Sequence, residues 1–172
     1  QCNSTLQLIP ERIIQKVREW FDTDKTLFTY RGGGLIKVIF PEPDKQILAE
    51  LGKLVAVGTK ENCEFVIQVL NSYNGNEVTH DLYKEIIDSL PLDSDLISEI
   101  SCGLDSEGVV RGEFGYVATY LRKKAEIEPW LTDSREKIKQ FARQHIISLD
   151  HQIADEQRRA EQQLELRIRD FG

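Results

Sequence analysis

The sequence predicts an all-α fold, a short α-α superhelix of about three helical hairpins with a long C-terminal helix. Apolar residues recur at i, i+3, i+4 and i+7 in nearly every segment, which is the spacing of one helix face. Helix pairs repeat about every 30 to 40 residues, and tight turns alternate with longer links, as in stacked hairpins. A compact helical bundle is the alternative, because it shows the same spacing.

The first helix is expected over residues 10–22, because Pro10 suits a helix start and the apolar residues after it share one face. Residues 26–40 are expected to be irregular or a small hairpin, since β-branched and aromatic residues flank Arg31-Gly32-Gly33-Gly34. Successive glycine amides can cradle a phosphate, but a P-loop continues with Gly-Lys-Ser or Gly-Lys-Thr, and Leu35 follows here. A flexible turn is the preferred interpretation of the glycine run.

Four further helices are delimited by residues that begin or end helices. Asp44 and Thr59 can accept hydrogen bonds from N-terminal amides, and Thr79 is expected to do the same. Gly58 and the Asn74-Gly75 pair suit the left-handed conformation that ends a helix. These signals predict two helical hairpins, with helices over residues 44–58, 59–74, 79–90 and 93–103.

A third hairpin is expected after the glycine-containing loop at residues 105–112. Pro129 ends its first helix, and Asp133 with Glu136 three residues later resembles a capping box that opens the second helix. This last helix continues beyond Ile153, where charged residues replace most of the apolar ones. The inner face of the preceding helix is expected to consist of Phe114, Val117, Ala118, Leu121 and Ala125.

Residues 130–142, Trp-Leu-Thr-Asp-Ser-Arg-Glu-Lys-Ile-Lys-Gln-Phe-Ala, resemble a HEAT repeat. The family places an Asp in the turn within a repeat and a basic residue six positions later, and Asp133 and Lys139 match these positions. The resemblance implies that Asp133 caps the second helix, that Lys139 bridges to a neighbouring repeat and that Trp130 is a packing anchor. Lys replaces the usual Arg, which loses a planar donor fork. The expectation for residues 1–172 is a single HEAT-like domain.

The stretch from residues 108–115 through 150–159 is similar to the C-terminal repeat regions of large bacterial multidomain proteins. Some of these proteins carry a signalling NTPase of the STAND or NACHT type before the repeats. This similarity implies a sensor or docking region. Because the sequence opens with Gln1-Cys2-Asn3 and contains no methionine, we expect a C-terminal fragment of a longer protein. Three cysteines without CxxC spacing favour a cytoplasmic location.

No catalytic arrangement is evident in the sequence. His80, His145 and His151 are too scattered for a helical metal pair, and Cys63 and Cys102 lack a neighbouring histidine. We therefore expect a protein that is not an enzyme and that uses no metal or cofactor. No small-molecule substrate is suggested, and no apolar stretch approaches the roughly 20 residues of a membrane span.

Charge is segregated along the chain, whose formal net charge is -7. Residues 42–107 hold 14 acidic and 4 basic residues, a net of -10, whereas residues 108–145 hold 8 basic and 5 acidic residues, a net of +3. An acidic surface repels nucleic acids and suits a basic protein partner. The alternative is that the carboxylates only keep the protein soluble. The candidate binding residues are Asp81, Glu85, Asp88 and Glu99.

The sequence thus predicts a noncatalytic protein-protein interaction scaffold, whose partner is another module of the parent chain or a separate basic protein. The alternative is a DNA-binding protein or an enzyme of the HEAT-like DNA glycosylase type. Trp20, Trp130 and the basic run Arg122-Lys123-Lys124 favour this alternative, and the acidic middle of the chain opposes it. We expect both tryptophans to be packing anchors and the basic run to be a solvated face. A structural spacer without a ligand is a third possibility.

Overall fold

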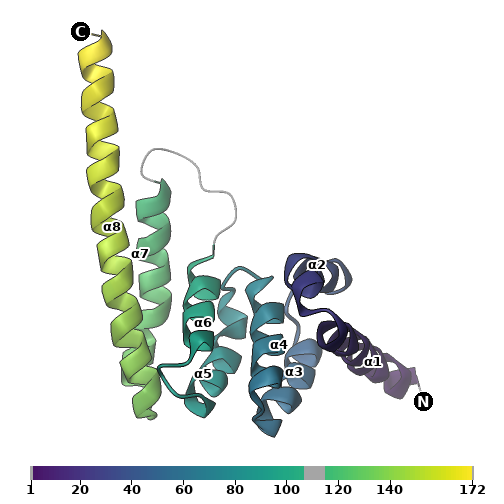
Figure 1. Cartoon of the computed structure of the whole chain (residues 1–172). Coiled ribbons are helices and arrows are strands. Elements are labelled where there is room, and N and C mark those ends of the chain that lie inside the picture. Colours follow the sequence, from purple (N-terminus) through teal and green to yellow (C-terminus); the bar gives the residue numbers. More distant parts are fainter. Residues whose placement is uncertain (1, 107–114, 172) are drawn as a thin grey trace. The chain divides into compact units, whose positions relative to one another are not determined.

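The structure is a computed structural model that describes the backbone of residues 2–106 and 115–171 (Figure 1). In these ranges every regular element is helical, which confirms the all-α class. Eight of the described elements are α-helices and two are short 3-10 helices. The bounds are α1 (Cys2–Thr23), α2 (Lys25–Ile39), α3 (Lys45–Val57), α4 (Lys60–Asn71), η1 (Glu77–Thr79), α5 (His80–Ser89), α6 (Asp95–Asp105), α7 (Gly115–Ile127), η2 (Glu128–Thr132) and α8 (Glu136–Phe171).

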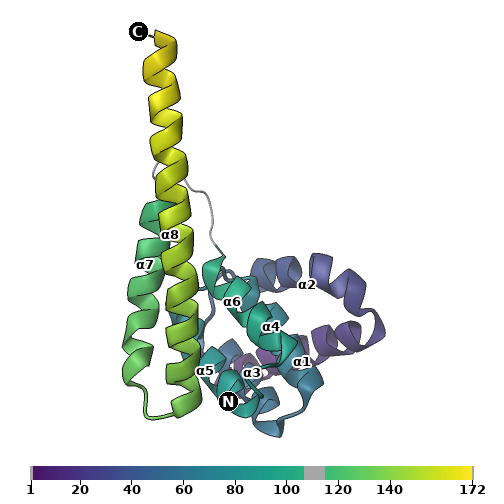
Figure 2. The same ribbon diagram turned by 60° about the vertical axis from the view of Figure 1, so that its left-hand side comes forward.

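The chain divides into two compact units, unit 1 (Gln1–Ser106) and unit 2 (Glu107–Gly172). Unit 1 has two layers of helices. In the first layer α3 contacts α1 and α5, and in the second layer α4 contacts α2 and α6. The hairpins α1–α2 and α3–α4 join the layers, and both views show α4 beside α6 (Figures 1 and 2). Within unit 1 the helix pairs α1–α2 and α3–α4 therefore lie side by side.

Helix α2 contradicts the prediction that residues 26–40 are irregular or a small hairpin. The glycine run lies inside this helix, where the backbone amides bond to carbonyls one turn earlier and are not presented as a phosphate cradle. Asp24 caps the helix, because its carboxylate accepts the Leu27 amide at 2.9 Å. Burial then outweighs the low helix propensity of glycine, since Phe28 and Ile36 are fully buried.

Gly32 is required by the packing of α2 itself. A Cβ atom at this position would lie 2.4 Å from the ring of Phe28, so the glycine leaves the space that the ring fills. That ring also meets Trp20 and Phe21 of α1 edge-on, with centroid distances of 5.3 Å in both cases. Phe65 of α4 lies 5.6 Å away. This aromatic cluster joins α1, α2 and α4, and it confirms Trp20 as a packing residue.

Helix α1 also differs from its prediction, because it begins at Cys2 and contains Pro10 in its interior. The caps of α3 and α4 are as predicted. Asp44 accepts the amides of Gln46 and Ile47, both at 2.9 Å, and Thr59 accepts the amide of Asn62 at 3.2 Å. Gly58, with φ of 74°, and Asn74-Gly75, with φ of 53° and 62°, adopt the left-handed conformation. Thr79 instead donates its hydroxyl proton to the Asn76 carbonyl and does not cap α5.

A close contact holds α4, α5 and α6 together. Asn71 of α4 accepts a hydrogen bond from the buried Tyr83 hydroxyl of α5 at 2.8 Å, and burial raises the pKa of this phenol. Gly103 of α6 lies against the same pair. A Cβ atom there would come within 1.9 Å of the Asn71 side chain and 2.9 Å of the Tyr83 hydroxyl. Only glycine lets α6 approach without displacing this hydrogen bond.

Replacing Gly103 with alanine should therefore lower the free energy of unfolding of unit 1 by about 1–3 kcal/mol, the usual cost of overpacking. Gly34→Ala is the matched control, because a Cβ atom at Gly34 has no atom within 4 Å. Alanine favours a helix interior over glycine, so this control should gain up to about 1 kcal/mol. Urea unfolding followed by circular dichroism measures both changes. Equal stabilities for the two variants would contradict the packing described for Gly103.

Unit 2 is the hairpin of α7 and α8 joined through η2, and α7 and α8 lie side by side in both views (Figures 1 and 2). Trp130 of η2 is 2% exposed, and its ring centroid lies 6.0 Å from that of Phe141, so it packs within unit 2, while its predicted role between repeats stays a prediction. The predicted inner face of α7 is wrong in part. Val117 is buried as expected, but Leu121 is 51% exposed and Ala118 and Ala125 are also exposed. Phe114 lies outside the described residues.

The basic run of α7 is not the solvated face that was expected. Lys123 is 3% exposed and lies 3.7 Å from Glu126, while Lys124 contacts Asp150 of α8 at 2.7 Å. Arg122, whose side chain is 58% exposed, also pairs with Glu126 at 2.9 Å. A buried lysine side chain takes its aliphatic stem into the packing and needs a charged or polar partner for its ammonium group. The α7 face therefore cannot be deduced from apolar residues alone.

Candidate acidic binding surface

Three of the four predicted binding residues form a row on α5, which we call the α5 stripe: Asp81, Glu85 and Asp88. Their spacing of i, i+4 and i+7 places them on one helix face, and all three are exposed. Lys84 contacts Asp81 at 3.2 Å, but the Asp81 side chain is 93% exposed and such a surface pair contributes little. The α5 stripe therefore presents carboxylates to solvent from the layer that contains α1, α3 and α5.

Glu99 lies apart from the α5 stripe, on α6 beside α4. Its carboxylate accepts a hydrogen bond from the Gln68 amide at 3.1 Å. Partial burial raises the pKa of Glu99, and the negative charges of Glu64 and Asp95 raise it further, whereas Gln68 and Lys60 act in the opposite direction. We call Glu64, Asp95 and Glu99 the α4–α6 patch. The four predicted residues thus belong to two surfaces, one on each layer of unit 1.

A groove between α1 and α3, in the same layer as the α5 stripe, was not predicted from the sequence. Its volume is about 340 Å³. Four carboxylates and two basic groups line it, so its net charge is negative. The lining residues are Glu11, Ile14, Gln15, Arg18, Glu19 and Asp22 of α1 and Glu50, Lys53 and Leu54 of α3.

The two basic groups of the groove are already engaged. Arg18 pairs with Asp22, donates to Asn62 at 3.2 Å and lies over the Phe65 ring, with its guanidinium carbon 5.4 Å from the ring centroid. Lys53 contacts Glu50 at 2.8 Å, a hydrogen bond that raises the pKa of the lysine. Glu11 has no ion-pair partner among the described residues. The groove therefore offers carboxylate charge to a cation from outside.

The residues that carry the HEAT resemblance interact locally. Asp133 accepts the Arg135 amide and its side-chain Nε, each at 3.0 Å, just before α8 begins at Glu136. In a capping box the Asp133 carboxylate would accept the amide of Glu136, three residues later. Here it accepts the amide of Arg135, two residues later. Lys139 contacts Glu136 at 2.5 Å within the same helix, and this contact lowers the pKa of Glu136. The predicted bridge from Lys139 to a neighbouring repeat stays a prediction.

The candidate nucleophiles and metal ligands within the described residues are cysteines and histidines. Cys63 is buried, its sulfur 3.9 Å from the Ser89 hydroxyl, and burial raises the pKa of its thiol, which disfavours the thiolate. Cys102 is exposed on α6. Within the described ranges, no three residues among His, Cys, Asp and Glu are grouped so as to hold a metal ion. His80 and His145 are buried.

In comparisons with known proteins, no family model, no curated protein and no solved structure matches this chain. Among the described helices, none is long and apolar enough to cross a membrane.

Replacing Glu99 with glutamine should stabilise unit 1 near pH 7. The raised pKa means that the folded state holds this proton more tightly than the unfolded state, so ionisation of Glu99 costs stability above its folded pKa. Below the unfolded pKa both states are protonated and the cost disappears. Thermal unfolding should give a higher Tm for Glu99→Gln at pH 7, and the difference from wild type should vanish below about pH 4. Glu85→Gln, on the exposed α5 stripe, is the control. A stability difference independent of pH would contradict the assignment.

Proposed function

We propose that this chain is a noncatalytic protein-binding module in which the layer of α1, α3 and α5 binds a basic protein segment. One observation carries the proposal: this single layer bears both the carboxylate-lined groove and the α5 stripe. Its helices contact in the order α1, α3, α5, so the two features lie on consecutive helices. A partner with spaced lysines or arginines would meet carboxylates along the whole layer.

The negative charge of the layer favours binding of a partner's cations to its carboxylates. The contacts of Lys53 with Glu50 and of Lys84 with Asp81 each join residues three apart on one helix, and one partner of each is largely exposed, Lys53 at 66% and Asp81 at 93%, so salt screens them. These two ion pairs therefore engage the carboxylates of Glu50 and Asp81 only weakly. A basic segment that supplies several cations at once would gain from their summed attraction, which acts mainly on the association rate and on the choice of partner.

The HEAT-like assignment and the origin from a larger bacterial sensor protein remain part of the proposal. Consecutive helix pairs with two layers support the first, because α-solenoids are built in this way. On this view unit 1 docks a basic segment of the parent chain or of a separate protein. The DNA glycosylase alternative draws less support, because Trp130 is buried and Lys123 and Lys124 lie beside carboxylates.

Neutralising the α5 stripe should weaken binding of a basic peptide. The test uses the full chain and a fluorescent helical peptide that carries lysines at i and i+4, with affinity followed by anisotropy over a range of salt concentrations. The triple variant Asp81→Asn, Glu85→Gln, Asp88→Asn should bind about tenfold more weakly, equivalent to about 1.4 kcal/mol, and should show a shallower salt dependence.

The matched control removes the same charge from unit 2 through Glu128→Gln, Asp155→Asn and Glu161→Gln, all of which are exposed. This control should bind as wild type does, because only the net charge has changed. If both triple variants lose affinity equally, attraction is nonspecific and the proposed surface is wrong. Circular dichroism spectra establish that helix content is unchanged in each variant.

A further inference from the structure

Helix α2 has a second apolar face that no described helix covers. Phe28 and Ile36 are fully buried, whereas five other apolar residues of α2 are exposed, and four of these, all but Ile39, lie on one side of the helix. Tyr30 is 83% exposed and Val38 is 78% exposed, and Leu27 and Leu35 are 41% and 43% exposed. We call Leu27, Tyr30, Leu35 and Val38 the α2 outer face. Single exposed apolar residues are normal, whereas apolar residues grouped on one face are typical of interaction surfaces.

The four residues share one side of α2. Their spacing of i, i+3, i+8 and i+11 keeps them on one side of an α-helix, about 120° around the helix axis from the buried face. Gly34 lies within this row, and a Cβ atom there would meet no other atom within 4 Å. The middle of the row is therefore low and open, with larger side chains on both sides of it.

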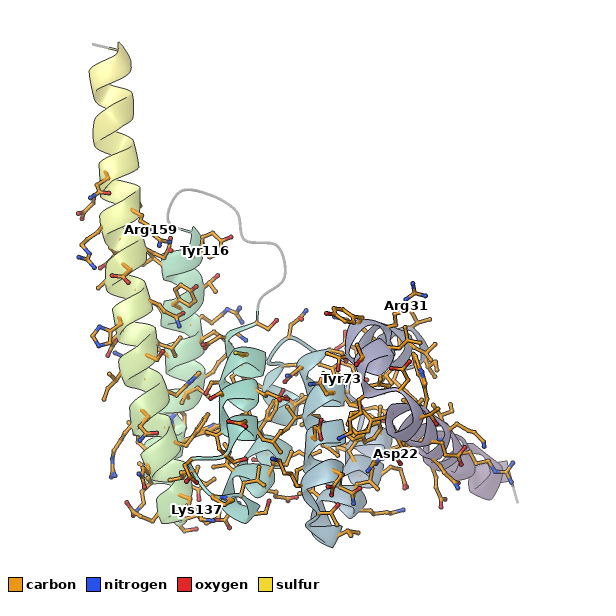
Figure 3. All side chains as sticks on the ribbon, in the orientation of Figure 1. Asp22, Arg31, Tyr73, Tyr116, Lys137 and Arg159 are labelled. Atoms are coloured by element: carbon orange, nitrogen blue, oxygen red, sulfur yellow. The ribbon has the colours of Figure 1, made fainter. Side chains whose placement is uncertain are left out.

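Basic residues accompany the row. Residues 25–41 contain Lys25, Arg31 and Lys37 and no acidic residue, in a chain whose net charge is -7. Lys25 is engaged by Glu64 at 2.7 Å. Arg31 and Lys37 are exposed and have no ion-pair partner among the described residues. Figure 3 shows the Arg31 side chain directed away from the neighbouring helices. The α2 outer face thus combines an apolar row with two unengaged cations.

We propose that the α2 outer face binds an acidic amphipathic helix of a partner protein. A helix fits because this layer already consists of helices that bury apolar rows on each other: α4 contacts both α2 and α6, and the α2 outer face offers the same kind of row to a further helix. The partner's apolar side covers Leu27, Tyr30, Leu35 and Val38, while its carboxylates pair with Arg31 and Lys37.

The charge of the surface favours a protein over an anionic membrane. Membrane surfaces attract basic residues with about 1 kcal/mol each and repel acidic ones, so stable attachment requires a cluster of cations. Only two unengaged cations, Arg31 and Lys37, lie on this face, which is fewer than such a cluster needs. A carboxylate-bearing helix needs only two well-placed partners, and the apolar row supplies the remaining contact area.

The test selects peptides for binding to the full chain from a displayed library of random helical peptides. Wild type should enrich peptides with apolar residues at i, i+3, i+4 and i+7 flanked by Asp or Glu. The best enriched peptide should bind at least about tenfold more weakly to Tyr30→Asp/Val38→Asp, since both side chains are exposed and their replacement leaves the core intact. Val57→Asp is the matched control, because Val57 of α3 is 66% exposed but lies outside the row.

A charge exchange tests the pairing directly. Arg31→Glu should weaken binding of the enriched peptide, and replacing the facing acidic residue of the peptide with Lys should restore it. Failure to enrich acidic amphipathic helices, equal loss in the Val57→Asp control, or absence of rescue would overturn the proposal. Flotation with phosphatidylserine-containing vesicles that depends on Tyr30 and Val38 would also overturn it. The triple variant of the α5 stripe should bind the enriched peptide normally, so this proposal can fail independently of the proposed function.

Discussion

The burial of α4 is the constraint on which the structure of unit 1 depends. Helix α4 contacts α2, α3 and α6, and six of its twelve residues are completely buried. These residues are Cys63, Phe65, Val66, Ile67, Val69 and Leu70. Truncating a buried phenylalanine to alanine typically costs about 3–5 kcal/mol, against a total stability of about 5–15 kcal/mol for a domain. Helix α4 therefore supplies a large part of the packing that holds α2, α3 and α6 in place.

The candidate binding surfaces lie on the outer faces of the two layers, away from the buried side of α4. The layer of α1, α3 and α5 carries the acidic groove and the α5 stripe, whereas α2, at one end of the other layer, carries an apolar row with cations. The two surfaces differ in chemistry, so they suit different partners. Under the proposed function, the packed helices would hold such partners at a fixed spacing, because helices packed by apolar burial are rigid compared with linkers.

Local signals predicted α3 and α4 well, because their ends are set by short-range chemistry. Asp44 and Thr59 accept the amides of their own first turns, and Gly58 takes a left-handed conformation that other residues avoid. Helix α2 was missed because its stability comes from contacts with distant residues. Phe28 packs against Phe65, which is 37 positions later in the sequence. A local sequence pattern cannot predict that such a distant contact will stabilise a helix through a glycine run.

The candidate site was predicted only in part for the same reason. The row of Asp81, Glu85 and Asp88 follows directly from helical spacing. That Glu99 belongs to another surface depends on its contact with Gln68 of α4, and the groove depends on the approach of α1 to α3. The apolar residues Leu121 and Ala125 suggested an inner face, but both are exposed, and the buried residue of that turn is Lys123, whose ammonium group lies 3.7 Å from Glu126. Because lysine can bury its aliphatic stem, a buried helix face that contains lysine cannot be recognised from hydropathy alone.

The most direct measurement of the central claim is hydrogen-deuterium exchange of the backbone amides of the full chain. If burial of α4 holds unit 1 together, the amides of Lys60–Asn71 should exchange most slowly in that unit, and those of Lys25–Ile39 should be protected because α2 is helical against α4. Rapid exchange throughout Lys25–Ile39, or exchange of α4 before α3 and α6, would contradict the account.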